Sequence, residues 1–445
     1  MFEFARRVRQ KLQKRGEELI GGVEKWGFKV RLYNRTPSID ILSECLIHKI
    51  LCFLSFEEAT RMSILSKTWL QAWSNLPNLD FTIDYLKDND MKIVDDIMKR
   101  YWDGKIPIEK FELSVETFFE NSHEVLLVPM IDKWLGVVLR NGVKHLTISS
   151  YPLFIFSILA VNSVRKLVLE YCTLLPSVVV VNCNSLRKLS LSYLTLDENM
   201  LQTLLNSCPL IESFTFVSSW GLETMNTQKI KSVSLKFLKI QHCGGIWEID
   251  APNLVSLKYT WEDIPQIKIV SESSQLKYSR IVFECLESDN VNAAWFCKLR
   301  KFLTNSISWS EFWISSHRCN NINIQNLQLD HKDSNPRVDV LYVNIIGKDE
   351  NSPTFVDALV WSCQPRILNL NSTREKITFF FDHLMNMKNS SHSTSQLSQI
   401  KEVKAYKFDP RYYKKESWRP VEHKSGELAI TNTEKWETCY FLLDW

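Results

Sequence analysis

A short apolar pattern, L-x-x-L-x-L with L standing for any large apolar residue, recurs along the middle of the chain. It occurs six times between 143–148 and 254–259. Its middle apolar residues follow one another at intervals of 19 to 25 residues and are Leu146, Leu167, Leu189, Phe214, Leu238 and Leu257. A period of this length indicates stacked units that each contribute one short strand. The sequence therefore predicts an α/β solenoid with a curved parallel sheet.

Further matches to the pattern are also expected to form strands, at 108–113, 324–329 and 365–370. Some of the links between matches have helical spacing instead, at 197–207, 291–305 and 354–363. The first of these helices is expected to begin at a capping Asp197. An acidic stretch near Asp95 and Asp96 is expected to lie in a solvated helix over 90–101.

A different spacing precedes the repeats. Leu46, Ile47, Ile50, Leu51 and Leu54 form a helical stripe. Ser55, with Glu58 three residues later, resembles a capping box, which predicts that a second helix begins there. Apolar residues then continue at steps of three and four through Trp69 and Trp73. These short helices carry more apolar surface than their roughly forty residues can hide, so we expect another surface to cover them.

This segment resembles the F-box. The residues that match the family pattern are Leu42, Glu44, Leu46, Ile47, Ile50, Leu51, Phe53 and Leu54, then Ala59, Arg61, Ser63, Leu65, Ser66, Lys67, Trp69, Trp73 and "LPNLDF" at 76–81. Ser43 stands where the family usually has proline, and Thr68 replaces the usual arginine. The resemblance implies a three-helix domain that docks on a SKP-type adaptor and, through it, on a cullin-based ubiquitin ligase. The adaptor contacts are expected at Leu42, Leu46, Ile50, Leu51, Leu54, Ile64, Leu65 and Trp69.

The chain from Phe81 onward resembles plant F-box proteins with degenerate leucine-rich repeats, including "LSLSYLTLDENMLQTLLNSCPLIE" and "IDAPNLVSLKY". Some of those proteins end in a small domain called FBD, to which 371–445 has a weak likeness. The expected organisation is a basic extension over 1–36, an F-box over 37–82, repeats over 83–370 and an FBD-like region over 371–445. The resemblance implies that the repeats bind a client protein.

Period-two alternation places one row of side chains on the open face of the predicted sheet. In that row Lys166 is expected to lie beside Lys188, and Lys239 beside Lys258. We expect these four lysines to form a mildly basic client-binding face that favours an acidic or phosphorylated peptide. Lysines that are simply solvated are the alternative.

Several functions are disfavoured. Residues 1–35 hold ten Lys or Arg against four Glu, a net +6 within a total of +3, so the rest of the chain carries −3 and nucleic acid is not the expected partner. The eleven cysteines form no CxxC and no zinc-finger spacing, and no catalytic motif is present, so we expect neither a cofactor, a metal nor an enzyme. Without a signal peptide or a membrane-length apolar run, an intracellular protein of the nucleus or cytoplasm is expected. The alternative is a stand-alone repeat scaffold, or a basic-tailed nucleic-acid binder, whose F-box has decayed.

Overall fold

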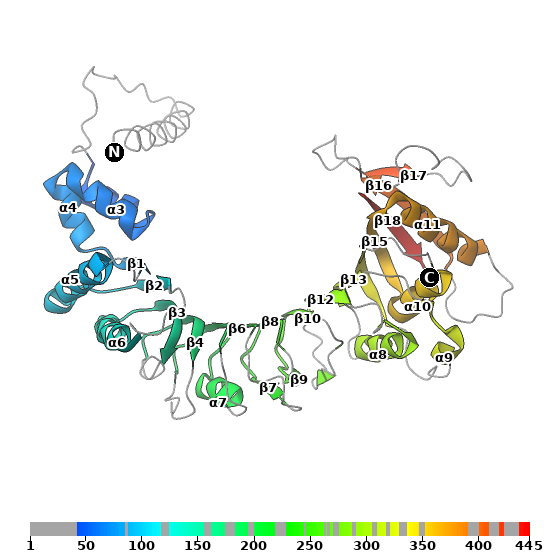
Figure 1. Ribbon diagram of the computed structural model, residues 1–445, viewed down its shortest axis with the longest axis horizontal. Helices are drawn as coiled ribbons and strands as arrows, with labels where there is room; N and C mark the ends of the chain where they lie inside the picture. Colours follow the sequence, from blue (N-terminus) through cyan, green and yellow to red (C-terminus); the bar gives the residue numbers. More distant parts are fainter. Residues whose placement is uncertain are drawn as a thin grey trace, which may run out of the picture. The chain divides into compact units, whose positions relative to one another are not determined.

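A computed structural model shows two compact units, residues 1–74 and 75–445 (Figure 1). The structure describes residues 42–445 except for the following segments: 85–87, 117–123, 155–161, 174–182, 195–199, 219–227, 244–245, 262–263, 265–267, 270–275, 287–290, 305–308, 317–320, 329–335, 347–351, 390–399, 409–417 and 422–435. The predicted basic extension over 1–36 and the predicted cap at Asp197 lie outside the described residues.

The first unit is helical. Its elements are α2 (Glu44–Cys52), α3 (Phe56–Met62), the 3-10 turn η2 (Ser63–Leu65) and α4 (Lys67–Ser74). The capping box predicted at the start of α3 is confirmed, because the Ser55 hydroxyl accepts from the Glu58 amide at 3.2 Å and the Ser55 amide donates to the Glu58 carboxylate at 3.1 Å. The three-helix arrangement expected from the sequence is therefore present.

The second unit is built on one sheet of fifteen strands. Twelve of them are parallel and lie in the order β1 (Asn78–Asp84), β2 (Lys110–Glu116), β3 (His145–Phe154), β4 (Lys166–Thr173), β5 (Lys188–Ser192), β6 (Ser213–Val217), β8 (Phe237–Gln241), β10 (Ser256–Trp261), β12 (Tyr278–Leu286), β13 (Trp309–Ser316), β14 (Val338–Ile345) and β15 (Pro365–Thr373). The sheet ends with three antiparallel strands, β18 (Trp436–Asp444), β16 (Glu402–Phe408) and β17 (Trp418–Val421). Seven repeat-pattern segments from 108–113 to 254–259, and the segment at 365–370, form strands of this sheet as predicted.

Helices lie along the convex side of the curved sheet (Figure 1). They are α5 (Asp88–Gly104), α6 (Glu124–Arg140), α7 (Met200–Ser207), α8 (Ala293–Leu303) and α9 (Ile324–Gln328). A second sheet of three short parallel strands, β7 (Gln228–Lys231), β9 (Ile246–Asp250) and β11 (Lys268–Ile269), has the order β11-β9-β7. These connections take the place of helices on the convex side, and the repeat pattern did not predict them.

The middle apolar residues of the repeats form one continuous row. Leu146 pairs with Leu167, Leu167 with Leu189, and the row continues through Phe214 and Leu238 to Leu257. Every member is almost completely buried. Because each side chain is covered by the equivalent residue of the neighbouring repeat, the core of this unit is built by stacking.

Two expectations about the second unit are wrong. The segment 324–329 was expected to be a strand, but Ile324–Gln328 is helix α9. The period-two alternation that places Lys188 and Lys258 on the open face also predicts Ser192 and Thr260 there, but both are buried. The segment 76–81 contributes to the second compact unit, where Asn78–Asp84 forms the first strand of the sheet.

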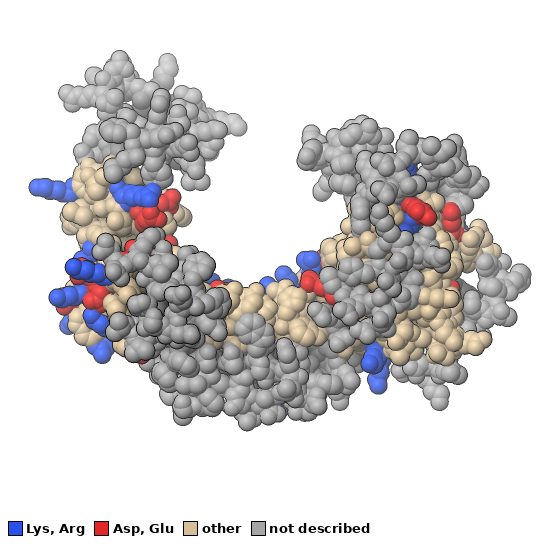
Figure 2. Space-filling view, in the orientation of Figure 1, with Lys and Arg blue, Asp and Glu red and all other residues tan. Residues whose placement is uncertain are grey.

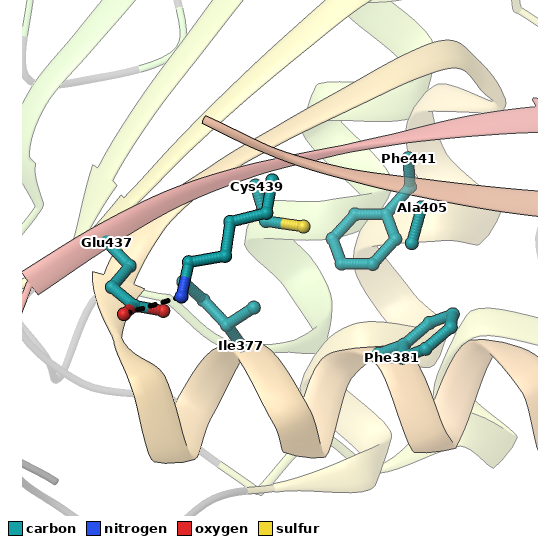
Figure 3. Close-up of a pocket in the computed structure, with 7 residues that line it drawn as sticks. Ile377, Phe381, Ala405, Glu437, Cys439 and Phe441 are labelled. Carbon is teal, nitrogen blue, oxygen red and sulfur yellow. Dashed lines mark ion pairs between the residues drawn. The ribbon is translucent and has the colours of Figure 1, made fainter. Parts of the chain in front are cut away.

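The C-terminal region combines α10 (Pro353–Cys363) and α11 (Arg374–Asn389) with the antiparallel strands. Apolar side chains of α11, among them Ile377 and Phe381, pack towards Cys439 and Phe441 of β18 (Figure 3). The cavity between them has a volume of only about 20 Å³ and is bordered by an ion pair of 2.7 Å between the side chains of Lys407 and Glu437. A space of this size holds at most one water molecule, so this region contains no ligand-sized cavity at that place.

Candidate interaction surfaces

Helix α2 carries two apolar stripes. Ile47 and Leu51, four residues apart, point into the helical unit and are buried. Leu46 and Phe53 lie on another side of the helix, with Ile50 between them, and their side chains are solvent-accessible: Phe53 is 90% exposed and Leu46 49% exposed. Because residues three and four apart share one helical face, Leu46, Ile50 and Phe53 form a single apolar edge.

Two further elements of the helical unit expose large apolar side chains. Ile64 of η2 is 80% exposed and its neighbour Leu65 is also exposed. Leu70 of α4 is exposed as well. We call the exposed large apolar residues of this unit the apolar set: Leu42, Leu46, Phe53, Ile64, Leu65 and Leu70. Exposed apolar residues in this number on so small a unit are typical of a protein-binding surface.

Two of the predicted adaptor contacts are instead core residues. Leu51 is 1% and Trp69 2% exposed, because the helical unit uses both side chains to fill its own interior. A direct contact of either with an adaptor is therefore not available in this conformation. Trp73 is half-buried: its ring lies 5.7 Å from that of Phe56, and its indole N–H donates to Thr60 Oγ1 at 3.0 Å.

The predicted adaptor contacts at Leu42, Leu46, Ile64 and Leu65 are exposed, and Ile50 and Leu54 are partly exposed. Two exposed residues were missing from the prediction, Phe53 and Leu70. Phe53 belongs to the matching F-box residues, and its spacing from Leu46 and Ile50 was the signal that could have found it.

On the second unit, the sheet brings the four predicted lysines into two pairs on adjacent strands. Lys166 of β4 pairs with Lys188 of β5, and Lys239 of β8 pairs with Lys258 of β10, as expected. Three of them, Lys188, Lys239 and Lys258, line an open groove with a volume of about 630 Å³. Figure 2 shows basic side chains along the rim of the middle of the sheet. Lys166 does not line the groove.

Four neighbouring repeat strands share a backbone feature that the sequence did not indicate. A residue with positive φ, between 44° and 56°, lies near the end of β4, at Tyr171, and directly after β5, β6 and β8, at Tyr193, Ser218 and His242. The amides of the last three donate to carbonyl groups of the next strand at 2.8 to 2.9 Å. Such left-handed residues are uncommon outside glycine, and here they recur in four neighbouring repeats.

Beside the groove lies an aromatic cluster, which the sequence prediction also missed. The guanidinium of Arg280 lies 4.8 Å from the ring centre of Trp313, which stacks on Tyr342 at 3.9 Å. The side chain of Glu311 forms an ion pair with Arg280 at 3.8 Å. Burial, and then the neighbouring Glu311 carboxylate, raise the pKa of Tyr278.

Among the described residues, no group of three or more His, Cys, Asp or Glu has a metal-binding arrangement, and no described helix is long and apolar enough to cross a membrane.

These observations define a protein with a small helical unit that exposes apolar residues, followed by a parallel solenoid with its helices outside. Family models agree with both parts: the F-box domain matches residues 39–81, and the LRR domain of At1g61320/AtMIF1 matches residues 97–312. The chain therefore carries an F-box and leucine-rich repeats, the domain pair of plant F-box/LRR-repeat proteins.

Several relatives from Arabidopsis thaliana agree with this assignment. At1g49610, whose name places it among the F-box proteins, is 32% identical over 252 residues, which cover 54% of this chain and 60% of the relative. The FBD-associated F-box protein At5g22730 is 23% identical over 312 residues, 63% of this chain and 64% of the relative. The F-box/FBD/LRR-repeat protein At1g13570 is 27% identical over 259 residues, 54% of this chain and 58% of the relative. The chain thus spans between 58% and 64% of the length of these curated relatives.

Proposed function

We propose that this protein is a non-catalytic substrate-recognition subunit of a SKP-cullin-F-box ubiquitin ligase. The helical unit docks on a SKP-type adaptor, and the repeats hold a client protein. The observation that carries the proposal is the apolar set on a unit that matches the F-box model. A ligase subunit of this kind does no chemistry itself, since holding the client near the conjugating enzyme raises its effective concentration.

Adaptor docking follows from the physics of the apolar set. Each large apolar side chain that moves from water into a groove of the partner contributes about 1.5–3 kcal/mol if it becomes fully buried. Phe53 and Ile64, the most exposed members, have the most area to lose. We therefore assign them as the principal adaptor contacts, supported by Leu46, Leu65 and Leu70, while Leu51 and Trp69 hold the docking surface in shape. A ligase subunit of this kind acts inside the cell, so we propose the nucleus or cytoplasm as its location.

Copurification with a plant SKP-type adaptor tests this role. The unaltered chain is expected to form a one-to-one complex in size-exclusion chromatography. Replacing both Phe53 and Ile64 with alanine should weaken the complex by about 10- to 100-fold, as expected for two interface anchors of roughly 1 kcal/mol or more each. The matched control replaces Ile93 and Val233, two exposed apolar residues of the second unit, with alanine and should change the affinity by less than about twofold.

Circular dichroism checks that both variants keep the helical content of the parent. The proposal fails if no complex forms, or if the folded Phe53→Ala/Ile64→Ala variant binds the adaptor as tightly as the parent. Salt-sensitive retention on nucleic acid that disappears when residues 1–35 are deleted would favour the alternative, a basic-tailed nucleic-acid binder.

A further inference from the structure

The groove on the open face of the sheet has the composition of a binding site for an anion. It is formed mainly by strands β5, β6, β8 and β10, and Lys188, Lys239 and Lys258 are among the residues that line it. The strand β12 adds Arg280, whose Cα pairs with that of Lys258. Lys239, Lys258 and Arg280 thus stand in one row on three adjacent strands.

The groove lysines and the cations around the groove differ in their ion pairs. At the entry to the strands, Arg187 and Lys236 both reach Glu212, at 3.0 and 3.5 Å, and Lys144 reaches Glu109 at 3.0 Å. None of the three groove lysines has a carboxylate within ion-pair distance among the residues that the structure describes. The one carboxylate that lines the groove, Glu212, is already held by the two cations at the strand entry.

Like charges on directly opposed residues of neighbouring strands destabilise a sheet. The pairs Lys166–Lys188 and Lys239–Lys258 both have this arrangement. An anion bound between the strands would relieve the repulsion, and a hollow lined by charges of one sign concentrates its field on a ligand of the opposite sign.

The groove also offers an apolar contact. Phe237 of β8 lines it and is 50% exposed, unlike Leu238 and Ile240 of the same strand, which are buried. An ammonium group of Lys258 lies 5.9 Å from the ring centre of Tyr278, at the far border of the groove. The ligand class that fits is therefore an anion with an apolar side chain, rather than a free inorganic ion.

Resting on the proposed client-binding role, we propose that this groove holds a short acidic segment of the client in extended conformation. Its carboxylates or phosphates lie against Lys188, Lys239 and Lys258, and an apolar residue lies on Phe237. From β5 to β10 the groove spans three strand spacings, about 14 Å, which is the length of roughly four extended residues. A nucleic-acid strand fits less well, because Glu311 and Glu284 lie on neighbouring strands and would repel a continuous phosphate backbone.

Fluorescence anisotropy of the full chain with a fluorescein-labelled peptide, Glu-Glu-Glu-Leu-Glu-Glu-Glu, tests the proposal. The peptide is expected to bind, to bind less tightly as salt is raised, and to bind at least about tenfold more tightly than the same peptide with Gln in place of Glu. Replacing both Lys188 and Lys258 with Glu should reduce the affinity by about tenfold or more. The matched control replaces Lys298 and Lys301, two exposed lysines of α8 on the other side of the sheet, with Glu and should leave the affinity unchanged.

Phe237→Ala separates the apolar contact from the charge: it should weaken binding of the Leu-containing peptide and leave that of an all-Glu peptide unchanged. Equal binding of the Gln and Glu peptides, or full affinity in the Lys188→Glu/Lys258→Glu variant, would overturn the proposal. Tighter binding of an oligothymidine, lost in the same variant, would also overturn it and assign the groove to nucleic acid. Adaptor copurification reads out the helical unit alone, so loss of peptide binding with a normal adaptor complex rejects only this inference.

Discussion

The helical unit and the repeat unit differ in how many of their large apolar side chains are exposed to solvent. In the repeats, the apolar row from Leu146 to Leu257 is hidden by neighbouring strands, and the open face carries mostly Lys, Ser and Thr. In α2 to α4, large apolar side chains such as Phe53 and Ile64 stay in water. A solenoid can cover each repeat with the next, whereas a unit of three short helices has too little interior to do so. The comparison indicates two kinds of recognition, apolar docking by the first unit and mainly electrostatic docking by the second.

The largest effect is expected in the small core of the helical unit. Trp69→Ala removes a side chain that is 2% exposed and should cost about 3–5 kcal/mol, as for other buried aromatic residues. Hydrogen exchange of peptides that cover α2 to α4 measures this loss of stability. Phe53→Ala, the control on the surface of the same unit, should change the stability by less than about 0.5 kcal/mol. Unchanged exchange in Trp69→Ala would contradict the division of this unit into core and docking residues.

A buried leucine of the repeats should have a slightly smaller effect. Leu167→Ala removes one member of the continuous apolar row and should cost about 2–4 kcal/mol, since the stacked neighbours relax only partly into the cavity. Faster exchange is expected in β3, β4 and β5, which contain Leu167 and its two partners. The adjacent control, Lys166→Ala, should be neutral or slightly stabilising because it removes the opposed charge of Lys188. A larger loss of stability in Lys166→Ala than in Leu167→Ala would contradict the assignment of the apolar row as the core of the repeats.

The repeat strands could be predicted because their burial follows the sequence directly. Period-two alternation and a regular interval together indicated β2 to β6, β8 and β10. The segment 324–329 failed because the spacing of Ile324 and Leu327 suits one face of a helix as well as the template. In the structure the Asn323 side chain accepts from the Gln325 amide at 3.0 Å, which caps the helical turn. The strands of the three-stranded sheet have no such period, so the repeat pattern could not predict them.

The docking surface could be predicted only in part, for a physical reason. Helix α2 is apolar on two stripes, one containing Leu46 and Ile50 and the other Ile47 and Leu51, and helical periodicity does not say which stripe faces inwards. Which stripe of α2 faces inwards depends on how α2 packs against α4, the helix that contains the buried Trp69. The register of the lysine pairs was easier, because equivalent positions of stacked repeats must lie side by side. The interactions of Glu212 and Arg280 join different repeats and were not visible in the sequence.

A moderate effect on the helical unit is expected from its capping box. Ser55→Ala removes the acceptor of the Glu58 amide and should destabilise α3 by about 1 kcal/mol. Ser74→Ala is the matched control, because the Ser74 hydroxyl only donates to the Leu70 carbonyl within α4 and should contribute a few tenths of a kcal/mol or less. Chemical unfolding, monitored by hydrogen exchange of residues 44–74, compares the stability of the two variants. An equal effect of both substitutions would mean that the cap does not help to hold this small unit together.

The smallest effect, and the only stabilising one in the helical unit, is expected at Ser43. The F-box pattern usually has proline there, and the φ of Ser43, −64°, is the angle that a proline ring imposes. The Ser43 side chain makes no capping hydrogen bond, and its amide has no acceptor among the residues that the structure describes. Ser43→Pro should therefore stabilise the unit by about 0.4–1 kcal/mol through the lower entropy of the unfolded chain. Ser43→Ala, which removes the hydroxyl but leaves the backbone free, should be neutral within a few tenths of a kcal/mol. If proline instead destabilises α2, the preceding Leu42 must occupy a helical conformation that proline disfavours, and the apolar edge of α2 begins one residue earlier than its hydrogen bonds indicate.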